Sequence, residues 1–281
     1  MVKLKEKLLI TGSDGFLGKN LQKFYKDKYS IFCHTRQDNI DDILYNIKPD
    51  IIINAAASIY DYDTMFESNV VLVNSILKYI KLTKSKLIQI GSSAEYGIKN
   101  NPSKETDLLE PIMFYAGTKA ASTMMCSSFA KEFDLPIVVA RPYSLYGIHE
   151  KPYRLFNRLY NSFKYNIPMT LNQAVHDFIY IKDFIHGIDI LINSSIDKIK
   201  GDIVNFGSGI QSSNMDVLQC FKNAFRFSPT TISIDHSTKK FFESDMWVCD
   251  TSYSQTKYNF KTKYTLQEGI DDLIKELSNA D

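Results

Sequence analysis

The chain has 281 residues, of which 44% are hydrophobic and 23% are charged, as expected of a soluble globular protein with a sizeable core. Acidic and basic residues are mixed along the chain and leave a net charge of +1, which argues against nucleic acid or a membrane surface as a partner. The sequence contains neither an uninterrupted apolar run of bilayer length nor the apolar segment of a signal peptide.

The four cysteines lie far apart, and none of them forms a C-x-x-C pair or has a histidine at ligand spacing. They are Cys33, Cys126, Cys220 and Cys249. In a chain of this size without a secretory signal, this pattern predicts reduced thiols, no metal site and a cytoplasmic location.

Strands and helices alternate through the first half of the chain. The segment DIIINAAA (50–57) is a continuous apolar run, as expected of a strand that is buried on both faces. The alternation predicts an α/β fold with right-handed crossovers and a doubly wound parallel sheet of the Rossmann type. Strands are expected at 8–11, 30–35, 50–57, 86–93 and 136–147, and helices at 15–29, 40–48, 62–84 and around Tyr115.

The pattern changes after Gly147. Helices are expected at 153–165, 182–192, from about 214 and at 264–277, and strands at 168–171, 176–180, 202–208 and 230–236. We therefore predict a nucleotide-binding domain over residues 1–150, to which the chain returns near 182–225. Residues 151–281 would form mainly a smaller, interleaved α/β lobe that binds the substrate.

The segment TGSDGFLG (11–18) follows the first predicted strand and opens the first predicted helix. Glycines allow a tight turn and a close approach of the backbone, and a helix N-terminus offers N–H groups and a positive dipole to a pyrophosphate. The spacing is G-x-x-G-x-x-G rather than the common G-x-G-x-x-G, so the prediction depends on the strand–turn–helix context. The predicted contacts are Gly12, Ser13, Asp14, Gly15, Phe16, Leu17 and Gly18.

The end of the second predicted strand bears on the choice of cofactor. NAD-binding proteins of this type place an acidic residue near this point, where it binds the ribose 2′-hydroxyl. Here the strand ends in His34, Thr35 and Arg36, and the first carboxylate is Asp38. Because a guanidinium suits bidentate phosphate binding, Arg36 favours NADP(H), with NAD(H) as the alternative.

The segment FYAGTKA (114–120) places Tyr115 and Lys119 four residues apart, on one face of a helix. One interpretation is ordinary packing with a solvated lysine. The other is acid–base chemistry, because a nearby cation favours phenolate and lowers the pKa of a tyrosine.

Taken together, seven segments resemble the extended short-chain dehydrogenase/reductase family that acts on nucleotide sugars, and the resemblance covers nearly the whole chain. No single motif decides it, but their order and spacing do. The segments are TGSDGFLG (11–18), NAAA (54–57), GSSAEYG (91–97), FYAGTKA (114–120), RPYSLYG (141–147), HDFIYIKDF (176–184) and TLQEGIDDLI (265–274).

The resemblance implies roles for three residues. Tyr115 would be the acid or base that exchanges a proton with the sugar oxygen, and Lys119 would hold the nicotinamide ribose and lower the Tyr115 pKa. Ser92, with Ser93 as the next candidate, takes the position of the catalytic Ser or Thr.

The resemblance also implies which residues contact the ligands. The implied cofactor contacts are the 12–18 turn, Arg36, Asn54, Ala55, Ala56, Ala57, Asn69, Tyr115, Lys119 and Pro142. The implied substrate contacts are Ser93, Tyr143, Ser144, Arg154 and His176.

The chain departs from the family pattern at two substrate positions. His176 replaces an arginine that contacts the pyrophosphate, for which Arg154, Lys239 and Lys240 are possible replacements. Ser144 replaces an asparagine near the sugar. The identities of the nucleotide and the sugar stay open.

Positions 93 and 94 distinguish the branches of the family. The 4,6-dehydratases have Asp-Glu where this chain has Ser93 and Ala94, and the 3,5-epimerases that make GDP-fucose have a cysteine in place of Ala94. Although His149 could supply one proton-transfer group, both reactions are disfavoured.

Two redox functions remain, and a reductase of a nucleotide-linked 4-keto-(6-deoxy)hexose is favoured. It would act in deoxysugar biosynthesis for surface polysaccharide such as O-antigen, and the short chain with its short second-to-third-strand connection favours it. The alternatives are a 4-epimerase with tightly bound NAD and, more remotely, a non-catalytic NADP-binding protein.

The resemblance also implies a homodimer in which the helix at 62–84 and the Tyr115 helix form a four-helix bundle with their twofold mates. The apolar residues expected on the exposed side are Ala121, Met124, Met125 and Phe129.

Overall fold

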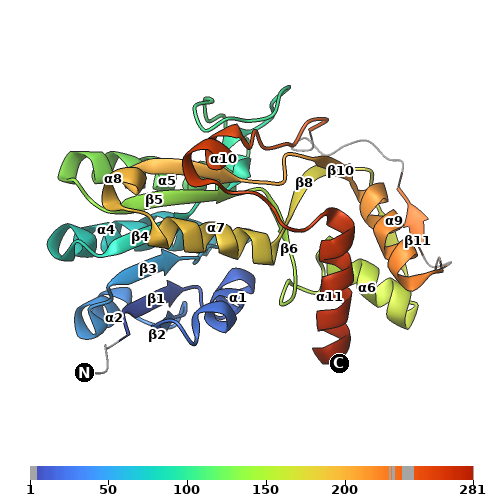
Figure 1. The fold of residues 1–281 in the computed structure, drawn as a ribbon, viewed down its shortest axis with the longest axis horizontal. Coiled ribbons are helices and arrows are strands. Elements are labelled where there is room, and N and C mark those ends of the chain that lie inside the picture. The colour runs from blue at the N-terminus through green and yellow to red at the C-terminus, as the bar shows by residue number, and fades with distance from the viewer. Residues whose placement is uncertain (1–4, 228, 230–231, 236–243, 281) are drawn as a thin grey trace.

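The computed structural model describes residues 5–280 except 228, 230–231 and 236–243. Six parallel strands form its central sheet in the order β2-β1-β3-β4-β5-β9 (Figure 1), which confirms the predicted α/β fold. Strands β3 and β5 are buried along their whole length, as their continuous apolar sequences require. The six strands are β1 (Lys7–Thr11), β2 (Ser30–His34), β3 (Ile51–Asn54), β4 (Lys86–Ile90), β5 (Ile137–Pro142) and β9 (Asp202–Phe206).

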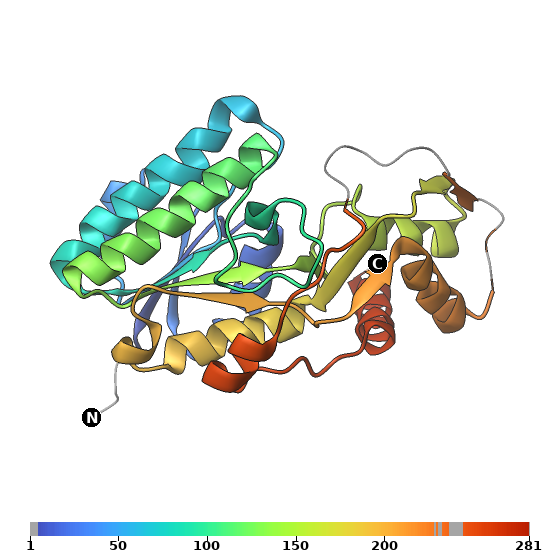
Figure 2. The same ribbon diagram turned by 90° about the horizontal axis from the view of Figure 1, so that it is seen from above.

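Helices cover both faces of this sheet. Leu8 and Ile10 point to the face that carries α1 (Phe16–Tyr25) and α7 (Ile181–Asn193). Leu9, between them in sequence, points to the opposite face, since successive side chains of a strand alternate. That face carries α2 (Ile40–Ile47), α4 (Leu72–Thr83) and α5 (Phe114–Phe133), and Figure 2 shows α4 and α5 side by side there.

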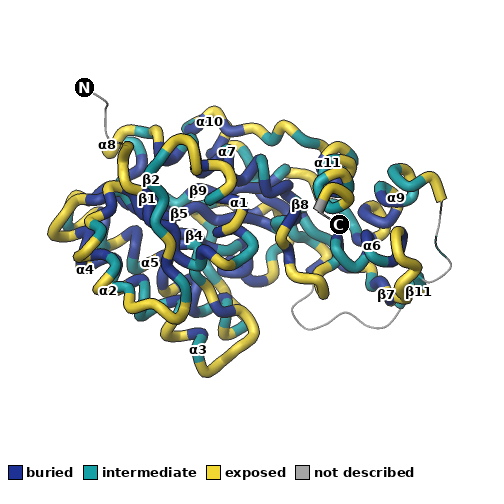
Figure 3. The backbone as a smooth tube through the Cα atoms, turned by 90° about the horizontal axis from the view of Figure 1, so that it is seen from below, coloured by how far each residue is buried: buried dark blue, intermediate teal, exposed yellow. Residues whose placement is uncertain are grey.

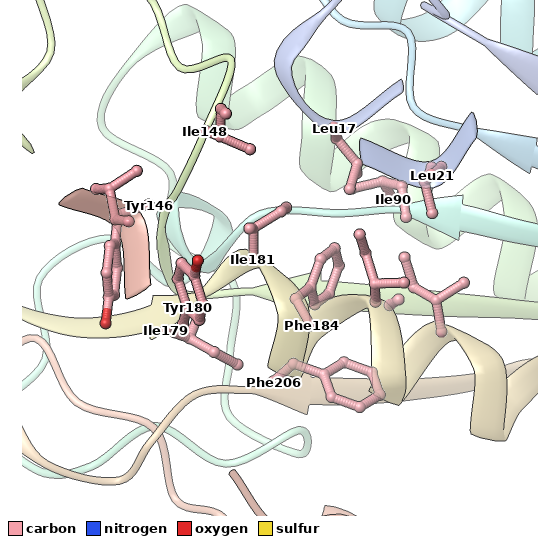
Figure 4. Close-up of a cluster of buried hydrophobic side chains, with 14 of the residues drawn as sticks. Leu17, Leu21, Ile90, Tyr146, Ile148, Ile179, Tyr180, Ile181, Phe184 and Phe206 are labelled. Atoms are coloured by element: carbon pink, nitrogen blue, oxygen red, sulfur yellow. The ribbon is translucent and has the colours of Figure 1, made fainter. Parts of the chain in front are cut away.

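The larger buried cluster joins the two lobes. Figure 4 shows Leu17 and Leu21 from α1 in one cluster with Ile90 and with Phe184 of α7. The rings of Phe184 and Phe206 meet edge to face with their centroids 5.7 Å apart. The strands lie in the buried interior, whereas the region of α3 projects into solvent (Figure 3).

The expected single helix at 62–84 has an interruption. It consists of α3 (Tyr62–Phe66), a π-helical turn (Glu67–Val71) and α4. The widened turn contains Asn69, whose buried side chain is hydrogen-bonded to residues outside the helix. A π-helical turn of this kind is often found at functional sites.

In the part of the smaller lobe that the structure describes, the chain forms two short sheets and three helices, whose arrangement can be followed in Figure 1. One sheet has the order β10-β8-β6, and the other pairs β11 with β7. Its strands are β6 (Ser144–Tyr146), β7 (Met169–Leu171), β8 (Val175–Tyr180), β10 (Gln211–Ser213) and β11 (Ile232–Ile234), and its helices are α6 (Leu155–Tyr165), α9 (Asn214–Phe225) and α11 (Leu266–Ala280).

The strand expected at 136–147 breaks between β5 and β6, because the chain there leaves the central sheet for the smaller lobe. The N–H of Tyr143 still donates to Phe206 O, at 2.9 Å, so the break follows directly after the last sheet pairing. Of the strand expected at 230–236, the structure shows Ile232–Ile234, while residues 230, 231 and 236 lie outside the described residues.

The chain returns to the first lobe through α7 and β9, and this return ends at Phe206 rather than near 225. Helix α9 packs against α6 and α11 in the smaller lobe. A short helix that the sequence did not predict, α10 (Ser252–Tyr258), packs against β9 in the first lobe. A second unpredicted helix, α8 (Ile196–Ile199), precedes β9. Over the described ranges, no helix has both the length and the apolar character needed to cross a bilayer.

Candidate active site

The strand order fixes where a nucleotide could bind. Strand β1 lies between β2 and β3, so the connections after β1 and β3 leave the sheet toward opposite faces. In open parallel sheets, ligands bind at the carboxyl ends of the strands at such a point. Thr11 and Asn54 end these two strands in register, and the glycine turn and the NAAA segment begin there.

The glycine turn has the geometry that a pyrophosphate requires. Gly12 has φ +62°, and a Cβ at this position would lie 2.8 Å from Ala56 N. Helix α1 begins after Gly15 without a side-chain cap, so the N–H groups of its first turn stay available to an anion. Ser13 donates from its backbone N–H to His34 O, which fixes the turn against β2. The predicted turn, Gly12 through Gly18, therefore fits a dinucleotide.

The side chain of Asn54, which was expected to contact the cofactor, forms hydrogen bonds with neighbouring strands instead. Its side chain accepts from Thr11 Oγ1 at 2.5 Å and donates to Gln89 Oε1 at 2.7 Å, which links β1, β3 and β4. Thr11 Oγ1 also accepts from Ala56 N at 3.2 Å. These bonds hold the loop of Ala55, Ala56 and Ala57 at the end of the sheet, so the loop backbone remains to face a nucleotide.

Asn69, expected to contact the cofactor, also has its side chain fully engaged. Its Oδ1 accepts from Ser58 N, and its Nδ2 donates to Ser58 O and to Thr118 Oγ1, each at 2.9 Å. The residue therefore joins the loop after β3 to the helix that carries Tyr115 and Lys119.

Arg36 lies at the exposed end of β2, where its Nη1 is 3.6 Å from Asp61 Oδ2. The exposed fractions of the two side chains are 63% and 47%, so solvent screens the pair strongly. Asp38 folds back on its own turn, because its Oδ2 accepts from the N–H and hydroxyl of Thr35 at 2.7 and 2.8 Å.

Ser92, Tyr115 and Lys119 meet at the carboxyl end of β4. Ser92 follows this strand and caps a 3₁₀ helix (Ser93–Tyr96), while Tyr115 lies in the first turn of α5. The Ser92 hydroxyl lies close enough to the Tyr115 phenol to lower its pKa, and Lys119 Nζ donates to Ile90 O. The structure thus brings the three predicted catalytic residues together.

Burial dominates the electrostatics of this group. It raises the pKa of Tyr115 to about 12, although the nearby Ser92 hydroxyl acts in the opposite direction. It lowers the pKa of Lys119 to about 8, although the Glu95 carboxylate opposes this shift. The predicted lowering of the Tyr115 pKa is therefore wrong for this structure, because burial raises it and the Lys119 ammonium is directed to the Ile90 carbonyl rather than to the phenol.

Three of the predicted substrate residues lie in the smaller lobe or at its start. Ser144 Oγ lies 3.1 Å from His176 Nδ1, which joins two predicted substrate residues across β6 and β8. Arg154 precedes α6, and its Nε donates to Glu150 Oε1 at 3.2 Å. The positive charge of Arg154 lowers the pKa of Tyr115, although burial outweighs this effect.

Three other predicted residues are buried around the site. Ser93 lies in the 3₁₀ helix, Pro142 ends β5 opposite Phe206, and Tyr143 follows it. Lys239 and Lys240, considered above as replacements for the family arginine, lie outside the described residues.

The structure adds three residues that sequence reasoning missed. Tyr60 lies close enough to the Arg154 guanidinium to raise its pKa. Glu95 and Arg141 form a fully buried ion pair beside Ser92. A charged residue between Ala94 and Tyr96, at the end of an apolar strand, was the available signal for Glu95.

A hollow of about 200 Å³ opens at the opposite, amino-terminal edge of the sheet. Lys86 lines it and donates to Ile192 O and to Ser194 O, which ties the end of α7 to β4. Because the predicted catalytic side chains gather at the other edge, we assign no ligand to this hollow. Within the ranges that the structure describes, no cluster of His, Cys, Asp and Glu could hold a metal ion.

Comparison with known proteins shows to which family the chain belongs. The sequence model of the NAD dependent epimerase/dehydratase family matches residues 8–207, from β1 to the end of β9. The chain belongs to this family. A relative within the epimerase/dehydratase family, dTDP-D-glucose 4,6-dehydratase of Dictyostelium discoideum, is 25% identical over 266 residues. That match covers 75% of this chain but only 60% of the relative.

Two solved structures of epimerase/dehydratase enzymes share the fold. dTDP-glucose 4,6-dehydratase from Bacillus anthracis str. Ames, in complex with NAD, superposes with a TM-score of 0.86 at 18% identity, covering 98% of this chain and 97% of that one. UDP-glucuronic acid 4-epimerase from Bacillus cereus, in complex with UDP-glucuronic acid and NAD, gives a TM-score of 0.83 at 23% identity, covering 96% and 99%.

Proposed function

We propose that the chain is an NAD(P)H-dependent reductase that delivers hydride to C4 of a nucleotide-linked 4-keto-(6-deoxy)hexose. The observation that carries this proposal is the composition of the site at the end of β4. One proton-transfer group, Tyr115, meets Ser92 there, while position 94 is an alanine, which transfers no proton. The next carboxylate, Glu95, has both oxygens engaged in hydrogen bonds and is not free for water elimination.

The protonation state of Tyr115 supports the reductive direction. A phenol with a pKa of about 12 stays protonated at neutral pH and can donate a proton to a developing alkoxide. The reverse reaction, oxidation of a C4 hydroxyl, needs the phenolate as its base. Burial of Tyr115 therefore favours the acid that reduction requires.

Each catalytic residue then has one task. A nicotinamide cofactor, when bound, would supply the hydride; its pyrophosphate would lie on the glycine turn, and Lys119 would hold its nicotinamide ribose. Ser92 would donate a hydrogen bond to the keto oxygen and hold it beside Tyr115. Tyr115 would transfer its proton to that oxygen as the carbonyl becomes an alcohol.

The substrate would lie between the two lobes, with its sugar at Ser92 and its nucleotide toward the smaller lobe. We assign sugar and nucleotide contacts to Ser93, Tyr143, Ser144, Arg154 and His176. The related proteins named above act on, or bind, dTDP- and UDP-linked sugars, which supports this substrate class.

For the cofactor, we propose NADP(H), with Arg36 at the ribose 2′-phosphate. The exposed guanidinium at the end of β2 supports this choice. Asp61 competes for the same guanidinium, and the two solved structures named above contain NAD, so NAD(H) stays the alternative.

The test separates the reductase from a 4-epimerase with tightly bound NAD. The dialysed protein is given NADPH or NADH with a 4-keto-6-deoxy nucleotide sugar, and the absorbance of the reduced nicotinamide is followed. A reductase consumes one reduced cofactor per keto sugar. Interconversion of two C4-hydroxy nucleotide sugars without added cofactor would overturn the reductase in favour of the epimerase.

A further inference from the structure

Glu95 and Arg141 form an ion pair directly beneath the catalytic serine. Both side chains have an exposed fraction of 0%. Glu95 Oε2 accepts from Arg141 Nη2 at 2.7 Å and from Arg141 Nε at 3.1 Å, so one carboxylate oxygen takes two charge-assisted hydrogen bonds and the other oxygen stays available to other donors. The pair joins two residues that are 46 positions apart in the chain.

The second oxygen of Glu95 faces the catalytic elements. Oε1 accepts from the backbone N–H of Ser92 at 2.7 Å and from Thr123 Oγ1 of α5 at 3.0 Å. Gly91 leaves room for this contact, because a Cβ there would lie 2.8 Å from Oε1. The carboxylate therefore connects the end of β4, which carries Ser92, to the helix that carries Tyr115.

Arg141 links this carboxylate to β9, the edge strand of the central sheet. Its Nη1 donates to Tyr96 Oη, and Tyr96 Oη donates to Asn205 Oδ1 of β9 at 2.9 Å. The guanidinium also lies 4.5 Å from the centroid of the Tyr96 ring. Because β5 and β9 are buried, neither partner of the ion pair can swing into solvent.

We propose that Glu95 is a positioning residue for the reaction: its carboxylate holds the Ser92 backbone so that the Ser92 hydroxyl faces Tyr115, and its charge acts on the Tyr115 helix. This inference rests on the proposed function only in taking Ser92 and Tyr115 as the reacting groups, which a reductase and a 4-epimerase would share.

The charge of Glu95 reaches several titratable groups. The titratable groups around it are Tyr96 in the 3₁₀ helix, Arg141 on β5, and Tyr115, Lys119 and Cys126 on α5. A second carboxylate, Glu105 in the loop after the 3₁₀ helix, interacts electrostatically with Arg141 and Tyr96. The carboxylate raises the pKa of Lys119, against the lowering by burial, and it raises the pKa of Tyr115. Without this charge, Lys119 would lose its proton at a lower pH.

Two double variants separate the backbone contact from the charge. Removing one partner alone would leave an unpaired buried charge, which is strongly destabilising, whereas replacing both keeps the interior neutral. In Glu95→Gln with Arg141→Met, the amide oxygen can still accept from Ser92 N–H, but the charge is gone. In Glu95→Leu with Arg141→Met, residue 95 has neither the acceptor for Ser92 N–H nor the charge.

The expected results differ between the two variants. The leucine variant should lose about 10- to 100-fold in kcat, the scale expected from misplacing a reacting group, with NADH affinity at pH 7 within about threefold of the wild type. The glutamine variant should keep kcat at neutral pH within about threefold. Its NADH affinity should fall at a lower pH than that of the wild type, because the Lys119 ammonium is lost earlier.

NADH binding needs no sugar substrate, and kcat is compared in whichever reaction the wild type performs. Failure of the reductase proposal would therefore change the reaction of the wild type but not the ratios between variants. A folded leucine variant with wild-type kcat, or a glutamine variant with an unshifted pH dependence, would overturn the inference.

A further variant disturbs the same contact without replacing either residue of the ion pair. Gly91→Ala should displace Oε1 and lower kcat, and it should add little to the loss already caused by Ser92→Ala if Glu95 acts through Ser92. Two results would contradict the proposal that Glu95 acts through Ser92. One is an unchanged kcat in Gly91→Ala, and the other is a double variant whose loss in kcat equals the product of the losses in the two single variants.

Discussion

The phenol of Tyr115 is half-buried and lies beside the Ser92 hydroxyl, as its proposed role in proton transfer requires. Tyr115→Phe removes the only hydrogen-bonding atom of the side chain and keeps its ring. We expect turnover to fall by about 10²- to 10⁴-fold while NADH affinity stays nearly unchanged, because the lost group acts on the sugar oxygen. Steady-state kinetics and cofactor fluorescence measure the two quantities. Tyr62→Phe, on an exposed side chain nearby, is the matched control, and near-normal turnover in Tyr115→Phe would refute the assignment.

In the ligand-free protein, burial of the Lys119 ammonium lowers the free energy of unfolding. Burial lowers its pKa from 10.5 to about 8, so at pH 7 the buried ammonium costs about 3 kcal/mol of unfolding free energy. Lys119→Met should therefore raise the stability of the ligand-free protein at pH 7 and abolish turnover. Between pH 8 and 10.5 the unfolded chain binds more protons at this residue, so its contribution to stability rises with pH.

Urea denaturation at pH 7 and pH 10 measures both effects. The stability difference between Lys119→Met and the wild type should shrink at pH 10. Lys78→Met, at an exposed position of α4, should show no such change with pH. Equal unfolding free energies for Lys119→Met and the wild type at pH 7 would contradict this account.

Arg36 and Asp61 offer paired tests of cofactor choice. If Arg36 binds a 2′-phosphate, NADPH should bind about 10- to 150-fold more tightly than NADH, and Arg36→Ala should remove most of that preference. Asp61→Asn should increase the preference, because it frees the guanidinium. Titration of each variant with both cofactors is the measurement. Equal affinities of the wild type for the two cofactors would show that Arg36 acts only as a surface residue.

At the scale of the elements, the π-helical turn between α3 and α4 depends on Asn69. Its side chain makes three hydrogen bonds to Ser58 and Thr118. Asn69→Ala should leave the buried Ser58 N–H without its acceptor and cost about 1–3 kcal/mol of unfolding free energy. It should also raise the KM for the cofactor, because the loop after β3 loses its anchor. Asn74→Ala, at an exposed position of α4, is the control, and equal stability of the two variants would contradict the role of Asn69.

Most of the helices and strands could be predicted from the sequence, because the apolar runs of β3 and β5 and the periodic helices between them are local signals. The π-helical turn could not, since its cause lies in hydrogen bonds from Asn69 to residues 11 and 49 positions away. The break after Pro142 depends on pairing with β9, which no local pattern reveals.

The same distinction holds for the site. The sequence motifs predicted that Ser92, Tyr115 and Lys119 would meet. They gave the wrong direction for the Tyr115 pKa, because spacing along a helix says nothing about burial. The Glu95–Arg141 pair could not be predicted either, since only the folded sheet brings the 3₁₀ helix after β4 next to β5.

At the scale of the whole molecule, α4 and α5 lie together on one face, as the proposed four-helix bundle requires (Figure 2). Ala121 and Met124 are exposed on α5, whereas Met125 and Phe129 are partly buried against the core and contribute less to a contact surface than the sequence suggested. Phe66 of α3 is a further exposed apolar side chain, 54% exposed as Met124 is.

We therefore expect a homodimer that Met124→Glu weakens, because the charge would be buried between the two copies. Sedimentation at micromolar concentration measures the effect. Ile210→Glu, on an exposed apolar side chain of the smaller lobe, should leave the dimer intact. A wild type that sediments only as a monomer would rule out the bundle.

The position of β9 has a consequence for how the protein is made. This strand completes the central sheet beside β5, yet α6, β8 and α7 precede it in the chain. A nascent chain that has left the ribosome only through Gly147 would hold five of the six strands and expose the open edge of β5. Asn205, through which Tyr96 and Arg141 are held, would still be untranslated. The surroundings of Ser92 therefore cannot reach their final form during synthesis of the first lobe, and they assemble only after β9 has been translated.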